Sequence, residues 1–316
     1  MNPRPTLKFG IYLPNVGWED VPSSEEMKAF AADAEASGFD SVWVEDRLLH
    51  PGTDILEAVT TLSFVASCTS QVQLGTSVLL FNLRNPIPLA KSLSTLNHLS
   101  DGRLVVGASL GGRPLEYEAS GIPTRTRVSR FVETVETLRS FWGQSDTADI
   151  NIPTMVAESM TPRPTRNPIP ILIGGRVEAA LKRAARIGDG WLASSTTTPE
   201  TFQRNWEIVR HHAIELGRDP SSLMPAKFVY IDVDDSEEQA LKRLESRLPR
   251  YYGAPYDAAN LTLYGPPDKC IEGAMRLLKA GVRTLIFATV TSNRDQLQRI
   301  AQDVIPVLRK EGISTF

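Results

Sequence analysis

The sequence predicts a single (β/α)8 TIM barrel that occupies residues 1–316. Short apolar segments alternate with longer amphipathic segments almost from end to end, which gives eight strand–helix units. Repeated β–α units form a parallel sheet, because each crossover returns the chain in the same direction. The first strand is followed by Tyr12-Leu13-Pro14 and not by a GxGxxG turn, so an open dinucleotide-binding sheet is disfavoured.

The expected strands are short and rich in aliphatic residues, as strands covered on both faces require. They span 7–13, 40–45, 72–81, 103–108, 169–173, 190–193, 226–233 and 284–290. The expected helices span 24–37, 56–68, 88–99, 128–142, 177–187, 199–216, 236–247, 267–280 and 294–309. Ser23 or Ser24 is the N-cap of the first helix, and Gly38 ends it. Two irregular stretches, 143–168 and 249–266, interrupt the alternation and are expected to be excursions from the barrel.

The composition is that of an ordinary globular protein, with 41% hydrophobic and 22% charged residues and a formal net charge of −3. This balance provides no field for holding a phosphate backbone, so nucleic acid is not expected as a partner. Cys68 and Cys270 lack metal-type spacing and indicate reduced thiols in a cytoplasmic protein. No apolar run approaches the length of a membrane helix, and no cluster of histidines and acids predicts a metal.

Active sites of such barrels lie at the C-terminal ends of the strands. Gly174-Gly175-Arg176 follows the fifth strand and precedes a helix. Its backbone N–H groups and the helix N-terminus are suited to hold a phosphate, and Arg176 adds a charge-assisted contact. The alternative is a plain strand–helix turn that needs glycine for its backbone conformation.

The fourth strand ends in Ser109-Leu110-Gly111-Gly112-Arg113, where the backbone can lie against a flat ligand. Residues 107–111 also match G-x-S-x-G, the nucleophile elbow of serine hydrolases, with Ser109 as nucleophile. An elbow needs a helix directly after its serine, which Gly111, Gly112 and Pro114 oppose. No His-Gly-Gly motif lies upstream. Serine hydrolysis is therefore the third hypothesis for this chain.

Glu45-Asp46-Arg47 ends the second strand and places three ionisable side chains where a ligand would meet them. A rim ion pair between Asp46 and Arg47 is the structural alternative. His50 lies just beyond and is the one histidine of four expected on the functional face. Apolar residues near the strand ends suggest a partly hydrophobic pocket for a small organic substrate; these are Trp18, Leu79, Phe81, Leu110 and Trp191.

Six stretches, in this order, resemble the bacterial luciferase-like monooxygenase family of flavin- and deazaflavin-dependent oxidoreductases. They are 37–44 (SGFDSVWV), 74–78 (LGTSV), 84–91 (RNPIPLAK), 100–104 (SDGRL), 168–175 (PIPILIGG) and 184–191 (AARIGDGW). The resemblance covers most of the chain and is weakest across the two excursions. It implies a TIM barrel and an oxidoreductase activity, either hydride transfer or O₂-dependent monooxygenation.

The resemblance also implies reduced FMN or reduced coenzyme F420 across the barrel mouth, with a slight preference for F420. A non-prolyl cis peptide is implied at Ser77–Val78, behind the cofactor ring, and the phosphate loop maps to Gly174-Gly175-Arg176. The expected cofactor-binding residues are Glu45, Thr76, Ser77, Val78, Ser109, Leu110, Gly111, Gly112, Arg113, Gly174, Gly175, Arg176 and Trp191.

One residue departs from the family pattern. Many members carry a histidine after the second strand, where this chain has Arg47. An arginine cannot act as a base near neutral pH, but it can stabilise developing negative charge. Asp46, or His50 if its loop folds inward, would then move protons, so Asp46, Arg47 and His50 are the expected catalytic residues. The missing histidine also motivates an alternative, a redox-inert flavin-binding barrel. The partners implied are an NAD(P)H-dependent reductase and a second copy of the chain.

Overall fold

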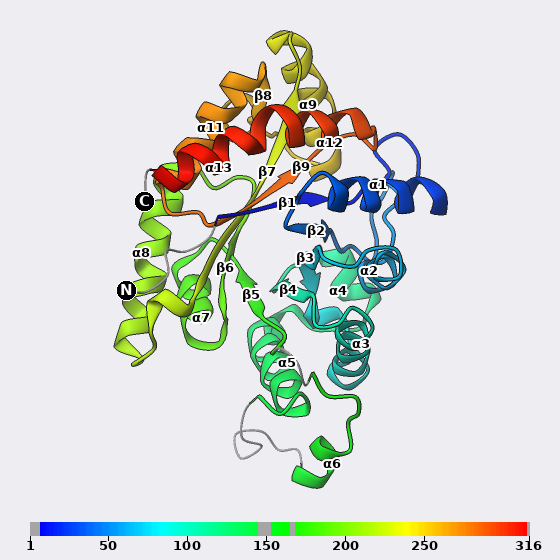
Figure 1. Cartoon of the computed structure of the whole chain (residues 1–316). Coiled ribbons are helices and arrows are strands. Elements are labelled where there is room, and N and C mark those ends of the chain that lie inside the picture. Colours follow the sequence, from blue (N-terminus) through cyan, green and yellow to red (C-terminus); the bar gives the residue numbers. More distant parts are fainter. Residues whose placement is uncertain (1–6, 145–152, 165–167, 315–316) are drawn as a thin grey trace.

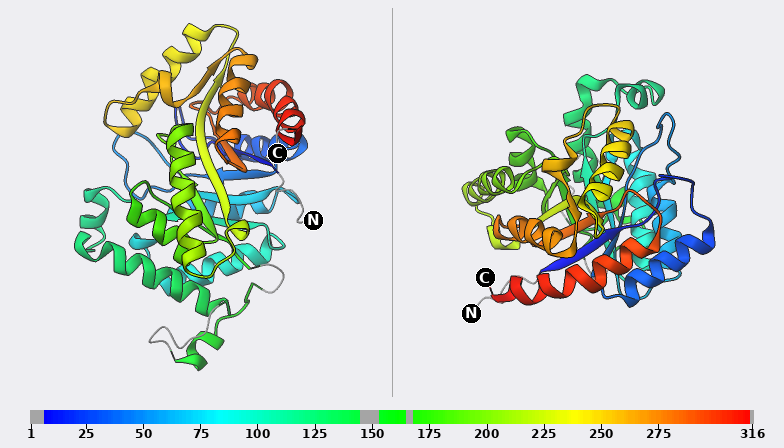
Figure 2. Two further views of the ribbon diagram at one scale, coloured as in Figure 1. Left: turned by 90° about the vertical axis from the view of Figure 1, so that its left-hand side faces the viewer. Right: turned by 90° about the horizontal axis from the view of Figure 1, so that it is seen from above.

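The computed structural model describes residues 7–144, 153–164 and 168–314. Within them, eight parallel strands close into a barrel surrounded by helices (Figures 1 and 2). These strands are β1 (Lys8–Tyr12), β2 (Ser41–Val44), β3 (Gln73–Leu80), β4 (Leu104–Ser109), β5 (Ile171–Gly174), β6 (Gly190–Ala193), β7 (Met224–Val233) and β9 (Thr284–Ala288). They follow one another around the ring, β6 pairs with β7, and β9 lies between β7 and β1. The predicted (β/α)8 barrel is confirmed.

Ten helical segments account for the predicted helices. They are α1 (Ser24–Ala36), α2 (Ala58–Ala66), α3 (Pro86–Leu99), α5 (Arg127–Phe141), α7 (Glu178–Ile187), α8 (Pro199–Glu215), α9 (Glu237–Tyr252), α11 (Pro267–Lys279), α12 (Arg294–Arg299) and α13 (Ile305–Ser314). A π-helical turn, Ile300–Val304, joins the last two, which were predicted as one helix. Three short helices were not predicted: α4 (Pro114–Ala119), α6 (Thr154–Glu158) and α10 (Ala258–Leu261).

Apolar side chains fill two layers, because successive residues of a strand point to opposite faces. Phe9 and Ile11 of β1 belong to the layer between the sheet and the helices, and both are fully buried. Tyr12 and Ile286 belong to the second layer, which fills the barrel interior. Along each strand, one residue therefore points into the barrel and the next points outward to the helices.

Trp43 fills the barrel interior beside two glycines. It is 2% exposed, and its indole Nε1 donates to Ser41 Oγ at 2.8 Å. Gly10 on β1 and Gly75 on β3 flank it, and a Cβ atom at either position would overlap the indole ring. The two glycines therefore provide the space that the tryptophan occupies.

The stretch 249–266 is more regular than predicted. Helix α9 continues through Pro249 to Tyr252, because Leu248 and Tyr251 are buried and Pro249 lies in the last turn, where few hydrogen bonds depend on it. Gly253, at φ 64°, then ends the helix. The strand β8 (Leu263–Gly265) follows α10 and pairs with the end of β7, outside the ring. In Figure 1, α9 and β8 lie at one end of the view and α6 at the other.

The other predicted excursion, 143–168, lies partly outside the described residues. Its described part carries the short helix α6. Cys68 and Cys270 are both free thiols. No helix in the described ranges combines the length and apolarity that crossing a membrane requires.

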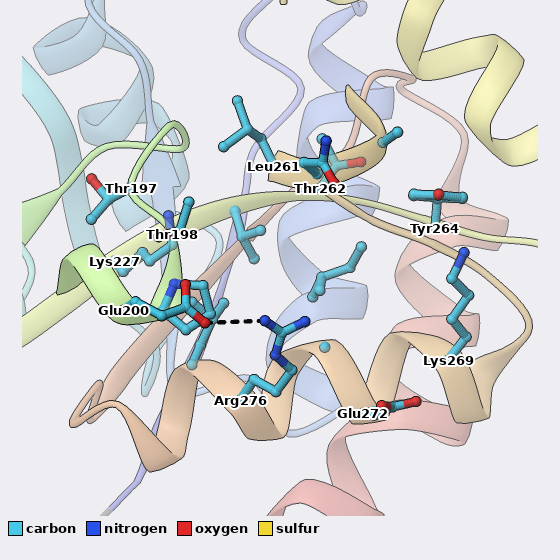
Figure 3. Close-up of a pocket in the computed structure, with 17 residues that line it drawn as sticks. Thr197, Thr198, Glu200, Lys227, Leu261, Thr262, Tyr264, Lys269, Glu272 and Arg276 are labelled. Atoms are coloured by element: carbon cyan, nitrogen blue, oxygen red, sulfur yellow. Dashed lines mark hydrogen bonds and ion pairs between the residues drawn. The ribbon is translucent and has the colours of Figure 1, made fainter. Parts of the chain in front are cut away.

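A buried lysine on the outer wall of the barrel supports the loop after β6. Lys227 is 1% exposed, and its Nζ donates to the carbonyl oxygens of Ser194 at 2.7 Å and Ser195 at 3.2 Å. Burial lowers the pKa of Lys227 to about 7. The lysine borders a cavity of about 380 Å³ between α8, α11 and β8 (Figure 3), in which Arg276 and Glu200 pair at 3.1 Å.

Substitution of the glycine beneath the tryptophan tests the interior packing. We expect Gly75→Ala to lower the free energy of unfolding by about 1–3 kcal/mol, because the new methyl group overpacks the core. Urea unfolding followed by circular dichroism measures it. The same change made in a Trp43→Phe background should be less damaging, because the smaller ring leaves room. Equal losses in both backgrounds would contradict this packing.

The buried lysine makes a pH-dependent contribution to stability. Because its pKa is about 7 in the folded chain and about 10.4 in the unfolded chain, the unfolded chain binds more protons between these values. The free energy of unfolding of the wild type should therefore rise relative to Lys227→Met as the pH increases from 7 to 9. Urea unfolding at pH 7, 8 and 9 measures this difference. The exposed Lys310→Met serves as the control, and its difference from wild type should stay constant. A constant difference for Lys227→Met as well would refute the lowered pKa.

Candidate active site

Aromatic side chains gather at the C-terminal ends of the barrel strands. We call this group the mouth cluster; its members are Tyr12, Trp18, Phe228, Tyr230, Tyr251, Tyr252 and Tyr256. The rings of Tyr252 and Tyr256 stack with centroids 5.1 Å apart. The ring of Trp18 lies 5.1 Å from that of Tyr251. The last turn of α9 and the loop after it thereby pack onto side chains that emerge from the barrel.

Glu45 follows β2 directly and borders a small recess with Tyr12, Trp18 and Tyr230. Its backbone is fixed by Asn15, whose side-chain amide donates to Glu45 O at 2.8 Å and accepts from Glu45 N at 3.1 Å. The Tyr251 hydroxyl donates to the carboxylate. Burial raises the pKa of Glu45, although the nearby Arg47 guanidinium and the Tyr251 hydrogen bond oppose this shift.

Asp46 holds two strand ends together. It is 2% exposed, and its carboxylate oxygens accept from Leu80 N at 2.9 Å and from Arg84 Nη2 at 2.8 Å. Arg84 also pairs with Glu57 at 3.0 Å. Both oxygens are therefore engaged in holding the strand ends, and the expectation that Asp46 moves protons stays a prediction. Its ion-pair partner is Arg84 and not Arg47.

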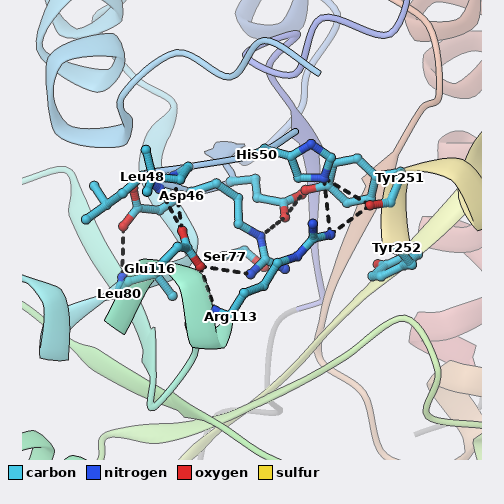
Figure 4. Close-up of polar contacts among 12 residues, drawn as sticks. Asp46, Leu48, His50, Ser77, Leu80, Arg113, Glu116, Tyr251 and Tyr252 are labelled. Atoms are coloured by element: carbon cyan, nitrogen blue, oxygen red, sulfur yellow. Dashed lines mark hydrogen bonds and ion pairs between the residues drawn. The ribbon is translucent and has the colours of Figure 1, made fainter. Parts of the chain in front are cut away.

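Arg47 lies between two carboxylates. Its Nε is 3.6 Å from Glu45 Oε1, and its Nη1 is 3.8 Å from Glu116 Oε2. Glu116 is fully buried in α4, where it accepts from Leu48 N at 2.9 Å and from Arg113 N at 2.7 Å. Glu116 thus ties the loop after β2 to the start of α4 (Figure 4). Sequence reasoning missed this residue together with its helix.

The loop that carries His50 folds inward onto α9. The imidazole stacks on the Tyr251 ring at 5.0 Å, and its Nε2 lies 3.0 Å from Tyr251 O. Arg113 Nη2 donates to the same carbonyl at 2.9 Å and lies 3.2 Å from the imidazole (Figure 4). Burial and the neighbouring arginines lower the pKa of His50. His50 is therefore neutral near pH 7 and is held by the Tyr251 backbone.

The peptide bond Ser77–Val78 is cis, which confirms the expectation at this position. The pairing of β3 with β4 shifts register between Thr76 and Leu79, so the bond lies in a bulge. The Tyr12 hydroxyl lies 2.8 Å from Ser77 O and 2.7 Å from Ser77 Oγ. Thr76 is buried and donates to Gly107 O at 2.8 Å, so it joins the strands beneath the bulge.

The ends of β3, β4 and β5 meet at Gly174. A Cβ atom at this position would lie 3.2 Å from Ser109 Cβ and 3.3 Å from Val78 Cγ1. Three segments that sequence reasoning assigned separately to a cofactor site are thus brought together at one edge of the mouth. We call this the β3–β4–β5 junction, formed by Val78, Ser109 and Gly174.

The turn after β4 is built from two glycines in the left-handed region, Gly111 at φ 36° and Gly112 at φ 77°. Leu110 O accepts from the Tyr117 hydroxyl at 2.6 Å, which fixes the turn against α4. Arg113 leads directly into that helix.

The histidines give no support to a nucleophilic Ser109. His50 contacts Tyr251, and His98 is exposed on α3. The remaining two histidines pair with Glu215 on α8. None of the four histidines of the chain therefore lies beside the serine as a base would.

The turn after β5 has features of an anion site. Helix α7 begins at Glu178 without a side-chain cap, so no side chain occupies its first N–H groups. The exposed Arg176 donates to Thr196 Oγ1 at 3.0 Å, so the loops after β5 and β6 lie together. Gly175 is required by its close approach to Ala180 of α7, where a Cβ atom would overlap.

Trp191 does not reach the mouth. It is fully buried in the layer between sheet and helices, stacks on Phe202 at 4.9 Å, and donates from Nε1 to Gly175 O at 2.9 Å. The indole is therefore bound to the backbone of the turn after β5, and the expectation that it contacts a ligand has no support in its position. Leu79 and Phe81 lie in the same layer, so they do not line a pocket at the mouth.

Unpaired polar atoms at the mouth fit a polar ligand. Arg47 Nε, His50 Nδ1 and Tyr256 Oη are buried without a hydrogen-bond partner. Buried polar atoms are normally paired, so three unpaired ones at the mouth suit an additional polar group there. None of the three residues borders the recess beside Glu45. No three His, Cys, Asp or Glu side chains among the residues described lie close enough to hold a metal ion.

Three tyrosines of the mouth cluster were missed by sequence reasoning, namely Tyr251, Tyr252 and Tyr256. They lie in the stretch that was predicted to be irregular. The run Tyr251-Tyr252-Gly253-Ala254-Pro255-Tyr256 was the available signal, since exposed excursions rarely carry three aromatic residues so close together.

Two curated enzymes are similar in sequence to this chain along most of its length. The F420-dependent glucose-6-phosphate dehydrogenase of Kineococcus radiotolerans is 27% identical, over 89% of this chain and 92% of that protein. The enzyme of the same name from Amycolatopsis mediterranei is 26% identical, over 91% and 95%.

Solved structures share the fold. An F420-dependent secondary alcohol dehydrogenase in complex with an F420–acetone adduct has a TM-score of 0.78 at 20% identity and covers 96% of this chain and 98% of its own. The oxygenating constituent of 3,6-diketocamphane monooxygenase from Pseudomonas putida, in complex with FMN, has a TM-score of 0.71 at 15% identity, over 95% and 98%.

One protein family matches this chain across all the strand ends that form the site. The family is described as luciferase-like monooxygenase, and its model matches residues 7–284, from the first barrel strand to the start of the last. This chain therefore belongs to the luciferase-like monooxygenase family.

Proposed function

We propose that this chain is an oxidoreductase that exchanges two electrons between a small, partly apolar organic substrate and coenzyme F420 bound at the barrel mouth. The observation that carries the proposal is the β3–β4–β5 junction. There the bulge at Ser77–Val78 and the end of β4 meet Gly174, where even a Cβ atom would crowd Ser109 and Val78, so the backbone itself forms the surface. A flat ring needs such a backbone-lined surface.

The residues around the junction suit the two ends of the cofactor. Ser77, Val78 and the turn 109–112 would contact the ring, and Gly175, Arg176 and the uncapped start of α7 would hold the phosphate. When bound, the cofactor supplies an acceptor or donor of hydride. The aromatic side chains of the mouth cluster would cover the substrate and exclude water from it.

Two considerations favour F420 over FMN. Both curated relatives described above are named for F420 and align with about nine-tenths of this chain. A phosphate held by Arg176 leaves the rest of the tail at an exposed edge, where an extended tail can continue. FMN is the alternative, and its use would require a separate reductase to supply the reduced form.

Titration of the purified chain tests this function. We expect oxidised F420 to bind with a micromolar dissociation constant, measured by fluorescence, and FMN to bind at least tenfold more weakly. Reduction of bound F420 is then assayed with glucose-6-phosphate and with propan-2-ol. Oxidation of reduced FMN by O₂ is assayed as the alternative. Failure to bind either cofactor would contradict the proposal, and tight binding without turnover of any substrate panel would favour a redox-inert barrel.

Two substitutions test the location. Gly174→Val should weaken F420 binding by at least tenfold, because its side chain fills the junction between Val78 and Ser109. Arg176→Ala should weaken binding by about tenfold, since a charge-assisted hydrogen bond contributes about 1.5–3 kcal/mol. Arg186→Ala, at the other end of α7, is the matched control and should bind like the wild type. Unchanged binding by Gly174→Val in a variant with wild-type circular dichroism would place the ring elsewhere.

A further inference from the structure

Glu45 differs from the other carboxylates around the mouth in having a free oxygen. Tyr251 and Arg47 both approach Oε1, and Oε2 has no hydrogen bond within the described part of the chain. Its side chain is 14% exposed and borders the recess between Tyr12, Trp18 and Tyr230. Glu45 can therefore present one lone-pair-bearing oxygen to the recess. The recess has a volume of about 10 Å³, room for a single water molecule that can pass a proton between Oε2 and a substrate at the mouth.

The neighbouring titratable side chains already bind other groups of the protein. Both oxygens of Asp46 hold the ends of β2 and β3, and those of Glu116 hold backbone N–H groups of the loop after β2 and of α4. His50 is held at the Tyr251 carbonyl. Arg47 stays protonated at any physiological pH. Glu45 is the group in this set that can both bind and release a proton at the mouth.

Tyr251 fixes the orientation of Glu45 from the opposite wall. It lies in the last turn of α9 and is 1% exposed. His50 stacks on its ring, and Arg113 binds its carbonyl, so both ends of the residue are held. Burial and the nearby Glu45 raise the pKa of Tyr251 well above its ordinary value, so its hydroxyl stays a donor. The carboxylate is thereby turned with Oε1 toward α9.

The surroundings of Glu45 combine positive charge with neutral phenols. Arg47 and Arg113 stabilise its ionised form, while burial and Asp46 stabilise its protonated form. The four phenols around it are uncharged at neutral pH. The balance between the ionised and protonated forms of Glu45 is therefore set by the arginines, by Asp46 and by burial. The titratable and charged groups that face Glu45 are Tyr12 from β1, Asp46 and Arg47 from the end of β2, Arg113 from the turn after β4, Tyr230 from β7, and Tyr251 and Tyr252 from α9.

We propose that Glu45 is a catalytic residue that takes up and returns the substrate's proton through Oε2, with Tyr251 as its positioning residue. The assignment rests on the proposed function. Oxidation of a carbinol breaks the C–H bond, and the hydrogen leaves as hydride with two electrons to the cofactor proposed above. The O–H bond also breaks, its electron pair forms the second C–O bond, and its proton moves to Oε2. Reduction runs in reverse, with protonated Glu45 as the acid.

The first test needs neither cofactor nor substrate. Infrared difference spectra of the chain with ¹³C-labelled glutamate, taken across pH, report each protonated carboxyl group. We expect one carboxyl band whose midpoint lies above the ordinary glutamate pKa of about 4.3. Glu45→Gln should remove this band and the exposed control Glu118→Gln should retain it. In Tyr251→Phe the midpoint should rise further, because a hydrogen bond that favours the ionised form is lost.

The second test compares binding with turnover. Glu45→Gln keeps an oxygen that accepts from Tyr251, so F420 should bind to it within threefold of the wild type. Its turnover of the substrate that the wild type uses should fall by about 100-fold or more, the range of general acid–base catalysis. The limb of the pH–rate profile that belongs to Glu45 should disappear.

The outcomes separate this inference from the proposed function. If the wild type binds no F420 or FMN, the proposed function fails, and the infrared titration still decides whether Glu45 holds a proton at the mouth. If Glu45→Gln retains the infrared band, or turns over substrate within threefold of the wild type with the same pH profile, the assignment of Glu45 is overturned. If the infrared titration midpoint of Tyr251→Phe equals that of the wild type, Tyr251 is not the positioning residue of Glu45.

Discussion

The buried carboxylate of Asp46 is the constraint on which the mouth depends. It binds Leu80 N and Arg84 across two strand ends, directly after the bulge at Ser77–Val78. Removing one partner of such a buried pair leaves an uncompensated charge, a loss of about 3–5 kcal/mol. The bulge in turn sets where Val78 meets Ser109 and Gly174. A charge in the wall therefore fixes the surface that faces the proposed cofactor.

The ionisable side chains at the mouth fall into two groups: most hold loops in place, and Glu45 keeps an oxygen free. Asp46 and Glu116 are consumed in holding loops, and His50 is held by the end of α9. Arg47 supplies positive charge at 3.6 Å from Glu45 without itself exchanging a proton. The proposal for Glu45 thus gives proton exchange to the neighbouring glutamate, at a site where the resemblance to the family led us to expect a histidine and the chain has Arg47.

Local sequence patterns predicted the barrel well because each strand of a parallel sheet is buried on both faces and reads as a short apolar run. They failed at the end of α9, which was predicted at residue 247 and lies at Tyr252. The aromatic residues beyond Pro249 form a wall of the site because the chain returns over the mouth there. Such contacts join residues far apart in the sequence, so local sequence patterns do not predict them. Asp46 was assigned to catalysis and Trp191 to cofactor binding for the same reason. Their positions at strand ends are readable in the sequence, but the partners that bind them are not.

The outer cavity beside Lys227 is the competing location for a ligand, and it lies on the helix side of β7. A crystal structure of the chain grown with oxidised F420 decides between the two. Our account predicts the deazaflavin ring against Ser77–Val78 and Ser109, with its phosphate at Gly175 and Arg176. Electron density for the cofactor in the outer cavity, or a mouth filled by its own aromatic side chains at saturating F420, would contradict it.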